Sequence, residues 1–535
     1  MMDFHGPQLL NALIFLPLVG AFVVLALPGK QEGLIRWTSL GFAFAELVLT
    51  CVLWRNFDML RAEDFQFMYP KDLWWIPELG VKYKVGVDGL SLPLVILTSF
   101  STVVAIGYSF VPIKTRIKEY FALFLLLEVG MMGTFLSLDI FLFYVFWEIS
   151  LVPMFLIIGI WGGPRREYAA IKFFLYTLIG SLAMLLAILA LYFTSEDAGS
   201  PTGHTFDVTW YLNPRNRDGL KMDPKALVLC FWAFYLAFAI KVPAWPFHTW
   251  LPDAHVEAPT GGSIILAAVL LKMGTYGLLR FCLPMFPDAA RGAAPVLMVI
   301  AIINIIYGSF VAMAQTDLKK LVAYSSVGHM GFVLLGFASA AQSVYNRPDG
   351  VSPEMFELGQ VTALNGAVFQ MISHGIITGG LFLLVGVIYE RSHHRDIDRY
   401  GGLAVAMPQY YGVTTFMCFA SLGLPPLAGF IGEFAALAGA FTVWRWLAGI
   451  CVIGVVVTAA YFLWLLQRVF LGELNPKYQD YPDLTKHEKL CLAPLVLATF
   501  LLGVWPKIVL EPVDPAMQQI VRVMGRERVK SAQLP

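Results

Sequence analysis

The stretch IKVPAWPFHTWLPDAHVEAPT, residues 240–260, follows an apolar run that ends at Ala239. It places Lys241, Pro243, Pro246 and two histidines where the preceding run predicts a bilayer. Proline removes a backbone donor and clashes with the preceding helical turn, so Pro243 and Pro246 predict a broken helix. At membrane depth such backbone survives only where it is buried in protein or lines a wet cavity. The stretch therefore predicts a helix broken in mid-membrane beside an ionisable side chain.

The composition of the whole chain is that of a membrane protein. Of its 535 residues, 58% are hydrophobic and 14% are charged, whereas about a quarter of a soluble domain is charged. Apolar runs of about 20 residues, the length that spans a bilayer, recur along the chain. We predict an all-α polytopic membrane protein. Its fourteen expected spans lie near 9–27, 34–54, 89–111, 118–137, 139–160, 168–193, 225–252, 260–282, 293–313, 318–339, 362–389, 404–444, 446–470 and 487–510.

Several classes of chemistry find no support in the residues. The formal net charge is zero and no basic, aromatic-interleaved patch occurs, which argues against a nucleic-acid partner. The six cysteines are isolated and no CxxC occurs, so neither an iron–sulfur ligand set nor a disulfide framework is visible. There is no Walker A loop and no GxGxxG motif. We expect no cofactor and no metal in this chain, and assign any redox chemistry to partner chains.

The distribution of Lys and Arg predicts the orientation. The first apolar run follows an N-terminus without Lys or Arg, which predicts a retained first span and no cleaved signal peptide. If both termini lie outside, the inside loops carry most of the basic residues, as the positive-inside rule requires. The long segments 55–88 and 194–224 then form caps on the outer side. The basic tail VRVMGRERVK, residues 521–530, would also lie outside, and nothing in the sequence explains its charge.

A second interrupted span, SLGLPPLAGFIGEF at residues 421–434, resembles the first in design. It is broken at Pro425-Pro426 and carries Glu433 just beyond the break. Paired broken spans in two halves of a chain are typical of transporters. The predicted organisation is an N-terminal part at 1–117, a first repeat at 118–282, a second repeat at 293–470 and a C-terminal part at 471–535.

Ionisable side chains recur about once per span through the middle of the chain. Such groups are costly in a bilayer and are functional candidates for that reason. A row of them would form a hydrophilic axis in the membrane plane. Structural alternatives stay open: the histidines could be satisfied core residues, Glu148 could be a structural partner of a lysine, and Lys172 could reach the membrane surface. The candidates are Glu128, Glu148, Lys241, Lys272, His329, His374 and Glu433.

The alternation of acids, lysines and histidines suits a proton relay. Burial destabilises a charged lysine and a nearby carboxylate stabilises it. At about 6 Å and an effective dielectric near 20, a Glu–Lys pair is worth roughly 3 kcal/mol. Moving one charge against roughly 150 mV costs about 3.5 kcal/mol. Because these magnitudes match, opening a Glu148–Lys241 pair could drive a proton from Lys241 towards Lys272.

Four segments carry a family resemblance. FYVFWEISLVPMF (143–155), FHTWLPDAHVEAPTGGSIILAAVLLKMGTYGLLRF (247–281), AQTDLKKLVAYSSVGHMGF (314–332) and LPPLAGFIGEF (424–434) closely resemble the antiporter-like membrane subunits of respiratory complex I. They favour the M-type member, which corresponds to mitochondrial subunit 4. The resemblance implies about fourteen transmembrane helices with two inverted five-helix repeats, each containing a broken helix.

The resemblance also implies roles for individual residues. Glu148 and Lys241 match the ion pair of the first half-channel, and Lys272 matches the central connecting lysine. His329 and His374 match relay positions of the second half. Glu433 matches the acid of the second broken helix, where sister subunits tend to have lysine. Glu128 matches a further acid of importance in the family.

The implied function is proton pumping in NADH:quinone oxidoreductase, driven from a distance by other subunits. NADH, FMN, iron–sulfur clusters and quinone are then expected in partner subunits. The expected neighbours are two sister antiporter-like subunits and a lateral helix, in a bacterial inner membrane or, as the alternative, an organellar one. Three other readings stay open: a multi-subunit cation/proton antiporter, the equivalent subunit of a photosynthetic, ferredoxin-driven or hydrogenase complex, and a membrane spacer without a proton path.

Overall fold

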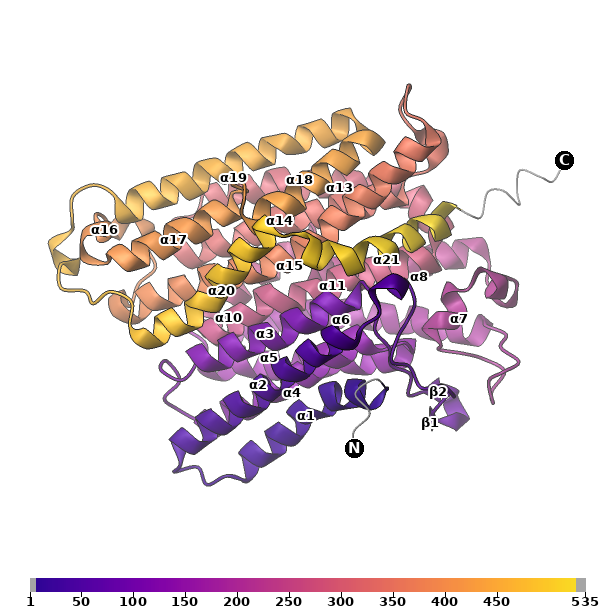
Figure 1. The fold of residues 1–535 in the computed structure, drawn as a ribbon, viewed down its shortest axis with the longest axis horizontal. Coiled ribbons are helices and arrows are strands. Elements are labelled where there is room, and N and C mark those ends of the chain that lie inside the picture. Colours follow the sequence, from indigo (N-terminus) through magenta and orange to yellow (C-terminus); the bar gives the residue numbers. More distant parts are fainter. Residues whose placement is uncertain (1–5, 526–535) are drawn as a thin grey trace.

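The computed structural model describes residues 6–525, which form a bundle of long helices with a small β-hairpin at one end (Figure 1). The hairpin pairs β1 (Trp74–Ile76) antiparallel to β2 (Val81–Lys82). The helices of the first half are α1 (Gln8–Ala26), α2 (Glu32–Asn56), α3 (Ser91–Tyr108), α4 (Ile117–Leu136), α5 (Ile140–Trp161), α6 (Arg166–Thr194), α7 (Val208–Leu212), α8 (Pro224–Lys241), α9 (Trp250–Glu257), α10 (Thr260–Ile265), α11 (Leu271–Gly277) and α12 (Leu283–Met285).

The second half is built in the same way from long helices and short connecting turns. Its helices are α13 (Pro287–Met313), α14 (Leu318–Ala341), α15 (Pro353–Ser392), α16 (Leu403–Ala406), α17 (Pro408–Ser421), α18 (Ala428–Trp444), α19 (Trp446–Phe470), α20 (Lys486–Val504) and α21 (Lys507–Gly525). Two π-helical turns, Leu266–Leu270 and Leu278–Cys282, join α10, α11 and α12 into one continuous span.

The predicted all-α membrane class is confirmed. Within residues 6–525, thirteen helices are long and apolar enough to cross a membrane. The remaining predicted span, 404–444, consists of two shorter helices, α17 and α18, on either side of a break. The predicted last span, 487–510, is shorter than expected because α20 ends at Val504 and Pro506 separates it from α21.

The helix order is the same in both halves: three continuous helices, one broken helix and one continuous helix. The first set is α4, α5, α6, α8 with α9, and α10–α12, and the second is α13, α14, α15, α17 with α18, and α19. Because each set crosses five times, an odd number, the second set starts on the opposite side of the membrane. This order fits the expected inverted repeats, whose limits in the sequence stay predictions.

The backbone groups that the first break exposes are satisfied inside the protein. Trp245 N donates to Asn304 Oδ1 at 2.7 Å, and Asn304 Nδ2 donates to Pro243 O at 3.1 Å. Trp250 Nε1 donates to Ile240 O at 2.7 Å, next to Lys241. Because lipid offers no hydrogen-bond partners at this depth, these side chains make the break tolerable.

The last helix, α21, is amphipathic and packs one face on the bundle. Its buried positions include Val513, Met517 and Val521, spaced four residues apart. Asn365 of α15 donates to Asp514 at 2.6 Å. The helix ends at Gly525, so the rest of the basic run at 526–530 lies outside the described residues.

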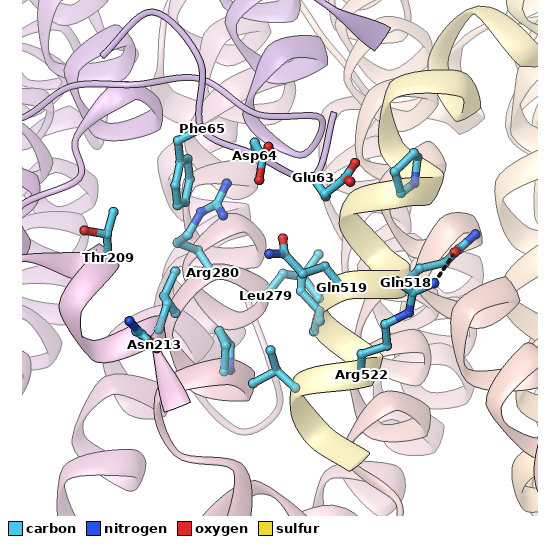
Figure 2. A pocket seen from close by; sticks show the side chains of 15 residues that line it. Glu63, Asp64, Phe65, Thr209, Asn213, Leu279, Arg280, Gln518, Gln519 and Arg522 are labelled. Carbon is cyan, nitrogen blue, oxygen red and sulfur yellow. Dashed lines mark hydrogen bonds between the residues drawn. The ribbon is translucent and has the colours of Figure 1, made fainter. Parts of the chain in front are cut away.

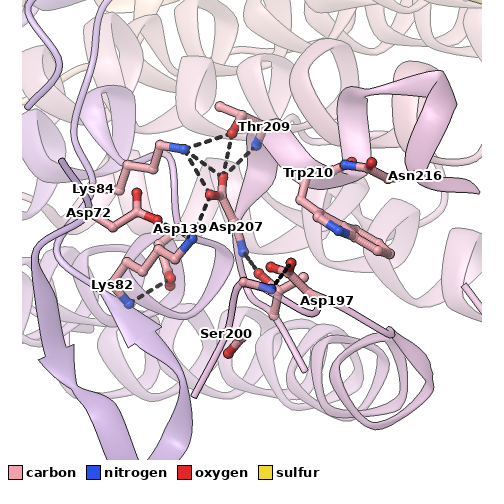
Figure 3. A network of polar contacts seen from close by, with 12 residues as sticks. Asp72, Lys82, Lys84, Asp139, Asp197, Ser200, Asp207, Thr209, Trp210 and Asn216 are labelled. Carbon is pink, nitrogen blue, oxygen red and sulfur yellow. Dashed lines mark hydrogen bonds and ion pairs between the residues drawn. The ribbon is translucent and has the colours of Figure 1, made fainter. Parts of the chain in front are cut away.

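We call the end that carries the two long caps the outer end, following the predicted orientation. There the β-hairpin is tied to the segment before α7 by a charge network (Figure 3). Lys84 Nζ lies 2.8 Å from Asp207 Oδ2, and Lys82 Nζ lies 3.1 Å from the same oxygen. Burial by itself raises the pKa of the Asp207 carboxyl, but Lys84 and Lys82 outweigh it and hold that pKa below its usual range.

We expect Asp207→Asn to destabilise the outer cap by about 2 kcal/mol, because the half-buried Lys84 loses its carboxylate and the buried Lys82 keeps only Asp72. Amide hydrogen exchange of residues 74–87 and 205–212 measures this opening free energy. A carboxyl with a lowered folded pKa contributes fully above its unfolded pKa of about 4 and loses that contribution as the pH falls further. The difference between variant and wild type should therefore shrink below about pH 4, and the exposed Asp218→Asn is the matched control. Equal exchange in both proteins at neutral pH would contradict the assigned role.

Candidate functional site

Four of the predicted residues form a buried series that leads from Lys272 of α11 into the second half. His329 Nδ1 lies 2.6 Å from Glu433 Oε1, so α14 meets α18 just beyond the second break. The rings of His329 and His374 have centroids 5.7 Å apart. His374 Nδ1 in turn lies 2.6 Å from Lys272 Nζ, which connects α15 to α11. These side chains are at most 4% exposed, so the chain is closed off from solvent.

The contact between Lys272 and His374 restricts how many protons the two groups can hold. Lys272 Nζ also donates to Ala267 O at 2.6 Å, within the π-helical turn that precedes it. A hydrogen bond between two nitrogens requires that one of them supplies a lone pair. The pair can therefore hold its shared proton on Lys272 or on His374, at a distance suited to transfer.

The Glu433 carboxylate is held by more than His329. Gln370 Nε2 donates to Glu433 Oε1 at 3.1 Å, and Ser373 Oγ donates to Gln370 Oε1 at 3.2 Å. On the other side, Ser421 Oγ lies 3.1 Å from His329 Nε2. Because Ser421 is the last residue of α17, the second break begins at this hydroxyl. The broken helix thus brings both of its ends to the same histidine–carboxylate pair.

In the first half, the predicted residues Glu148 and Lys241 are not paired. Lys241 is the last residue of α8, 1% exposed, with Nζ 3.5 Å from Ser150 Oγ and 4.2 Å from the centroid of the Trp147 ring. Glu148, on the same helix as Ser150, interacts with Lys241 electrostatically but forms no ion pair with it within 4.0 Å. Its Oε1 atom is buried without a hydrogen-bond partner. The expected Glu148–Lys241 pair is therefore open in this structure.

Close packing at Gly274 brings the helix of Lys272 against the helix of Lys241. A Cβ atom at this position would lie 2.8 Å from Phe238 O and 3.0 Å from Lys241 Cβ. Glycine therefore lets α11 approach the end of α8, two residues from Lys272. The row accordingly runs from Lys241 past this contact to Lys272 and on to Glu433.

Glu128 lies apart from the row. It is fully buried on α4, beside Thr102 of α3, and neither of its carboxylate oxygens has a hydrogen-bond partner. Its electrostatic neighbour is Glu46 of α2, a second fully buried acid that the sequence analysis did not single out. Glu46 is an acid within an apolar span, and this is the same pattern that identified Glu128 as a candidate.

Sequence reasoning also missed Gln370, Ser421, Ser150 and Asn304, which contact the predicted residues or the breaks. Neutral polar residues are common in helices, so only their position beside a charged group identifies them. Among the buried serines near the row, Ser373 joins it through Gln370, whereas Ser325 and Ser326 donate to the carbonyl of Val322. Lys172 lies at the inner end and pairs with Asp253 at 2.7 Å.

The outer end contains a cavity of about 530 Å³ between the outer cap and α21 (Figure 2). Arg280, which lies on the same span as Lys272, lines this cavity. Glu63, Asp64 and Arg522 line it from other segments. Arg280 is paired with the buried Asp88 at 2.5 Å and donates to the hydroxyl of Tyr276 at 3.1 Å. The span of α10–α12 therefore connects the centre of the row to a polar cavity on one side of the bundle.

Within the described residues no group of three or more His, Cys, Asp or Glu side chains is placed to hold a metal ion. The chemistry available to the row is proton binding and transfer between carboxylate, imidazole and amine groups.

Comparison with known proteins assigns the class. The family described as NADH:quinone oxidoreductase/Mrp antiporter, TM, matches residues 137–347 and 355–458. The chain belongs to this family of antiporter-like membrane subunits. It is 43% identical to NADH-quinone oxidoreductase subunit M of Rhodobacter capsulatus and 39% identical to NADH-ubiquinone oxidoreductase chain 4 of Marchantia polymorpha. The first alignment covers 96% of both chains and the second covers 96% of this chain and 97% of its relative.

Solved structures agree. A chain of respiratory complex I from Thermus thermophilus with bound NADH matches with a TM-score of 0.82 and 31% identity, covering 96% of this chain and all of that one. The chain is accordingly a membrane subunit of NADH-quinone oxidoreductase, of the M or chain 4 type, and other subunits of complex I are its partners. A chain of the Mrp complex from Dietzia sp. DQ12-45-1b, at 20% identity and a TM-score of 0.78, shares the fold.

We expect His374→Asn to lower quinone-linked proton pumping by roughly tenfold or more, because asparagine cannot take the proton that Lys272 shares with the imidazole. Acidification of native membrane vesicles, measured together with NADH oxidation, tests this. His393→Asn is the matched control, since His393 is exposed at the end of α15 and its positive φ of 54° suits asparagine. Pumping at the wild-type level in His374→Asn would remove this residue from the row.

Proposed function

We propose that this subunit moves protons across the membrane through the row formed by Glu148, Lys241, Lys272, His374, His329 and Glu433. Electron transfer from NADH to quinone in other subunits drives the movement. The observation that carries the proposal is the buried series from Lys272 through the two histidines to Glu433, with close polar contacts at both ends and neighbouring imidazole rings, 5.7 Å between centroids, in the middle. In a purely structural core, buried titratable groups would be paired separately. Here each titratable group lies beside the next one.

The first half acts as the switch. With Glu148 and Lys241 apart, the lysine is held by a hydroxyl and an aromatic face, which stabilise an ammonium less than a carboxylate does. Closing the pair favours the charged lysine, and opening it favours release of the proton towards Lys272. The break after Lys241 supplies the freedom of movement that a continuous helix would not.

The surroundings follow from the same assignment. Two sister antiporter-like subunits and a lateral helix are the expected neighbours within the membrane, and NADH, FMN, iron–sulfur clusters and quinone belong to other subunits. The inner membrane of a bacterial cell is the proposed location. The names of the similar proteins and the complex I structure support the part of this proposal that places the subunit in complex I.

The test is Lys241→Ala in native membrane vesicles that contain the complete complex. We expect loss of NADH-driven acidification and of quinone-linked turnover, because the row loses the group that receives each proton. NADH oxidation with an artificial acceptor should be unchanged, because that reaction occurs in other subunits. Native gels show whether the complex has assembled.

Two further variants sharpen the result. Glu148→Gln should also lower pumping, because the switch loses its carboxylate, and the exposed Lys477→Ala should pump normally. Normal pumping by an assembled Lys241→Ala complex would overturn the proposed row and favour a spacer without a proton path.

A further inference from the structure

Glu46 and Glu128 form a second buried acidic site, on the other side of α4 from the row. Both residues are fully buried, and none of their four carboxylate oxygens has a hydrogen-bond partner. No ion pair with a lysine, arginine or histidine reaches either residue in the described part of the chain. An acid in this state is costly, and an apolar residue would serve the packing of α2 and α4 better.

Helix contacts place the two acids at one depth. Glu46 lies on the buried stripe of α2, one turn from Thr50, whose hydroxyl lies 2.9 Å from Ser99 Oγ of α3. One turn from Ser99 along α3 is Thr102, which lies beside Glu128 of α4. Because α2 and α3 run in opposite directions, both steps lead from the Thr50–Ser99 contact towards the inner side. Glu46 and Glu128 therefore lie at the same depth, near the middle of spans α2 and α4, which pack directly on each other.

The hydroxyl groups nearby do not neutralise this site. Thr102 donates to Thr98 O at 2.9 Å, Thr98 donates to Leu94 O at 2.8 Å, and Ser99 donates to Ile96 O at 3.1 Å. These donors are already used by the backbone of α3. Two carboxylates in an apolar site without a cation cannot both stay ionised, so the site must bind a positively charged ligand.

We propose that Glu46 and Glu128 form an acid pair that binds a proton as one unit, a second proton site outside the row. The two carboxyl groups supply four oxygen atoms. A proton needs no more than these, whereas a hard metal cation is usually coordinated by about six oxygen atoms or more. Gly130 lies two residues after Glu128, on the opposite face of α4, and packs against Ser150 N. The hydroxyl of Ser150 is the group beside Lys241. The acid pair is thus separated from the switch by the single helix α4.

The role of the pair in pumping rests on the proposed function, whereas its proton binding does not, so the two are tested separately. Dicyclohexylcarbodiimide, an apolar reagent, reacts with protonated carboxyl groups in apolar sites. The carboxyl proton moves to a nitrogen of the reagent, and the carboxylate oxygen bonds to its central carbon. Membranes containing the complete complex are treated, and labelled peptides are identified by mass spectrometry.

We expect label at Glu46 or at Glu128, but not at both in one chain, because the first adduct fills the shared site. Glu46→Gln and Glu128→Gln should each remove their own label, and the double variant should remove both. Independent labelling of both acids in one chain would overturn the pair. The absence of label at both acids would also overturn it, as would protection by added Na⁺ with choline as the control, since that result defines a cation site.

Pumping by the same variants gives the second readout. Glu46→Gln should lower acidification by the same factor as Glu128→Gln, and the double variant should lose no more than either single one. The exposed Glu32→Gln at the start of α2 is the matched control and should pump normally. If the Glu46→Gln complex fails to assemble, the wild-type labelling experiment still tests whether the two acids bind one proton together. Loss of pumping by Glu128→Gln alone would overturn the role of Glu46 while leaving the row intact.

Discussion

Backbone hydrogen bonding without water is the constraint on which the rest of this structure depends. Both helices that carry a terminal charge of the row are broken at prolines, and each break leaves amide groups that the bilayer cannot satisfy. The protein supplies the missing partners from neighbouring helices, with Asn304 and Trp250 at the first break. Glycines at the contact points then let the helices approach, as Gly274 does beside Lys241. The charged groups lie where they do because this support exists only at these places.

The two halves of the row differ in how tightly they are connected. In the second half, distances of 2.6 Å join Lys272 to His374 and His329 to Glu433. In the first half, the Lys241 amine contacts a hydroxyl and an indole ring, and Glu148 forms no ion pair with it. A relay needs one element with two arrangements, and a pair that is open in one state is such an element. Under the proposed function, this asymmetry supports switching in the first half of the row and conduction in the second.

The proposed acid pair at Glu46 and Glu128 adds a second proton site that lies outside the row. The helices α2 and α3 lie outside the two five-helix sets, yet α2 directs an acid inward while presenting large apolar side chains such as Trp37 and Phe44 outward. A proton site at this position connects the N-terminal helices to the chemistry of the repeats. In that view α4 is shared between two proton sites, one on each side.

The sequence by itself determined the membrane class, the positions of both breaks and the charged residues of the row. These features are local, because apolar length, closely spaced prolines and a charge within an apolar run can each be recognised in a short stretch of sequence. Only the tertiary structure decided which groups touch. It joined Gln370 and Ser421 to Glu433 and His329, separated Glu148 from Lys241, and placed Glu46 opposite Glu128. Such contacts depend on helix rotation and on packing between segments that are far apart in the chain, and no local pattern encodes either.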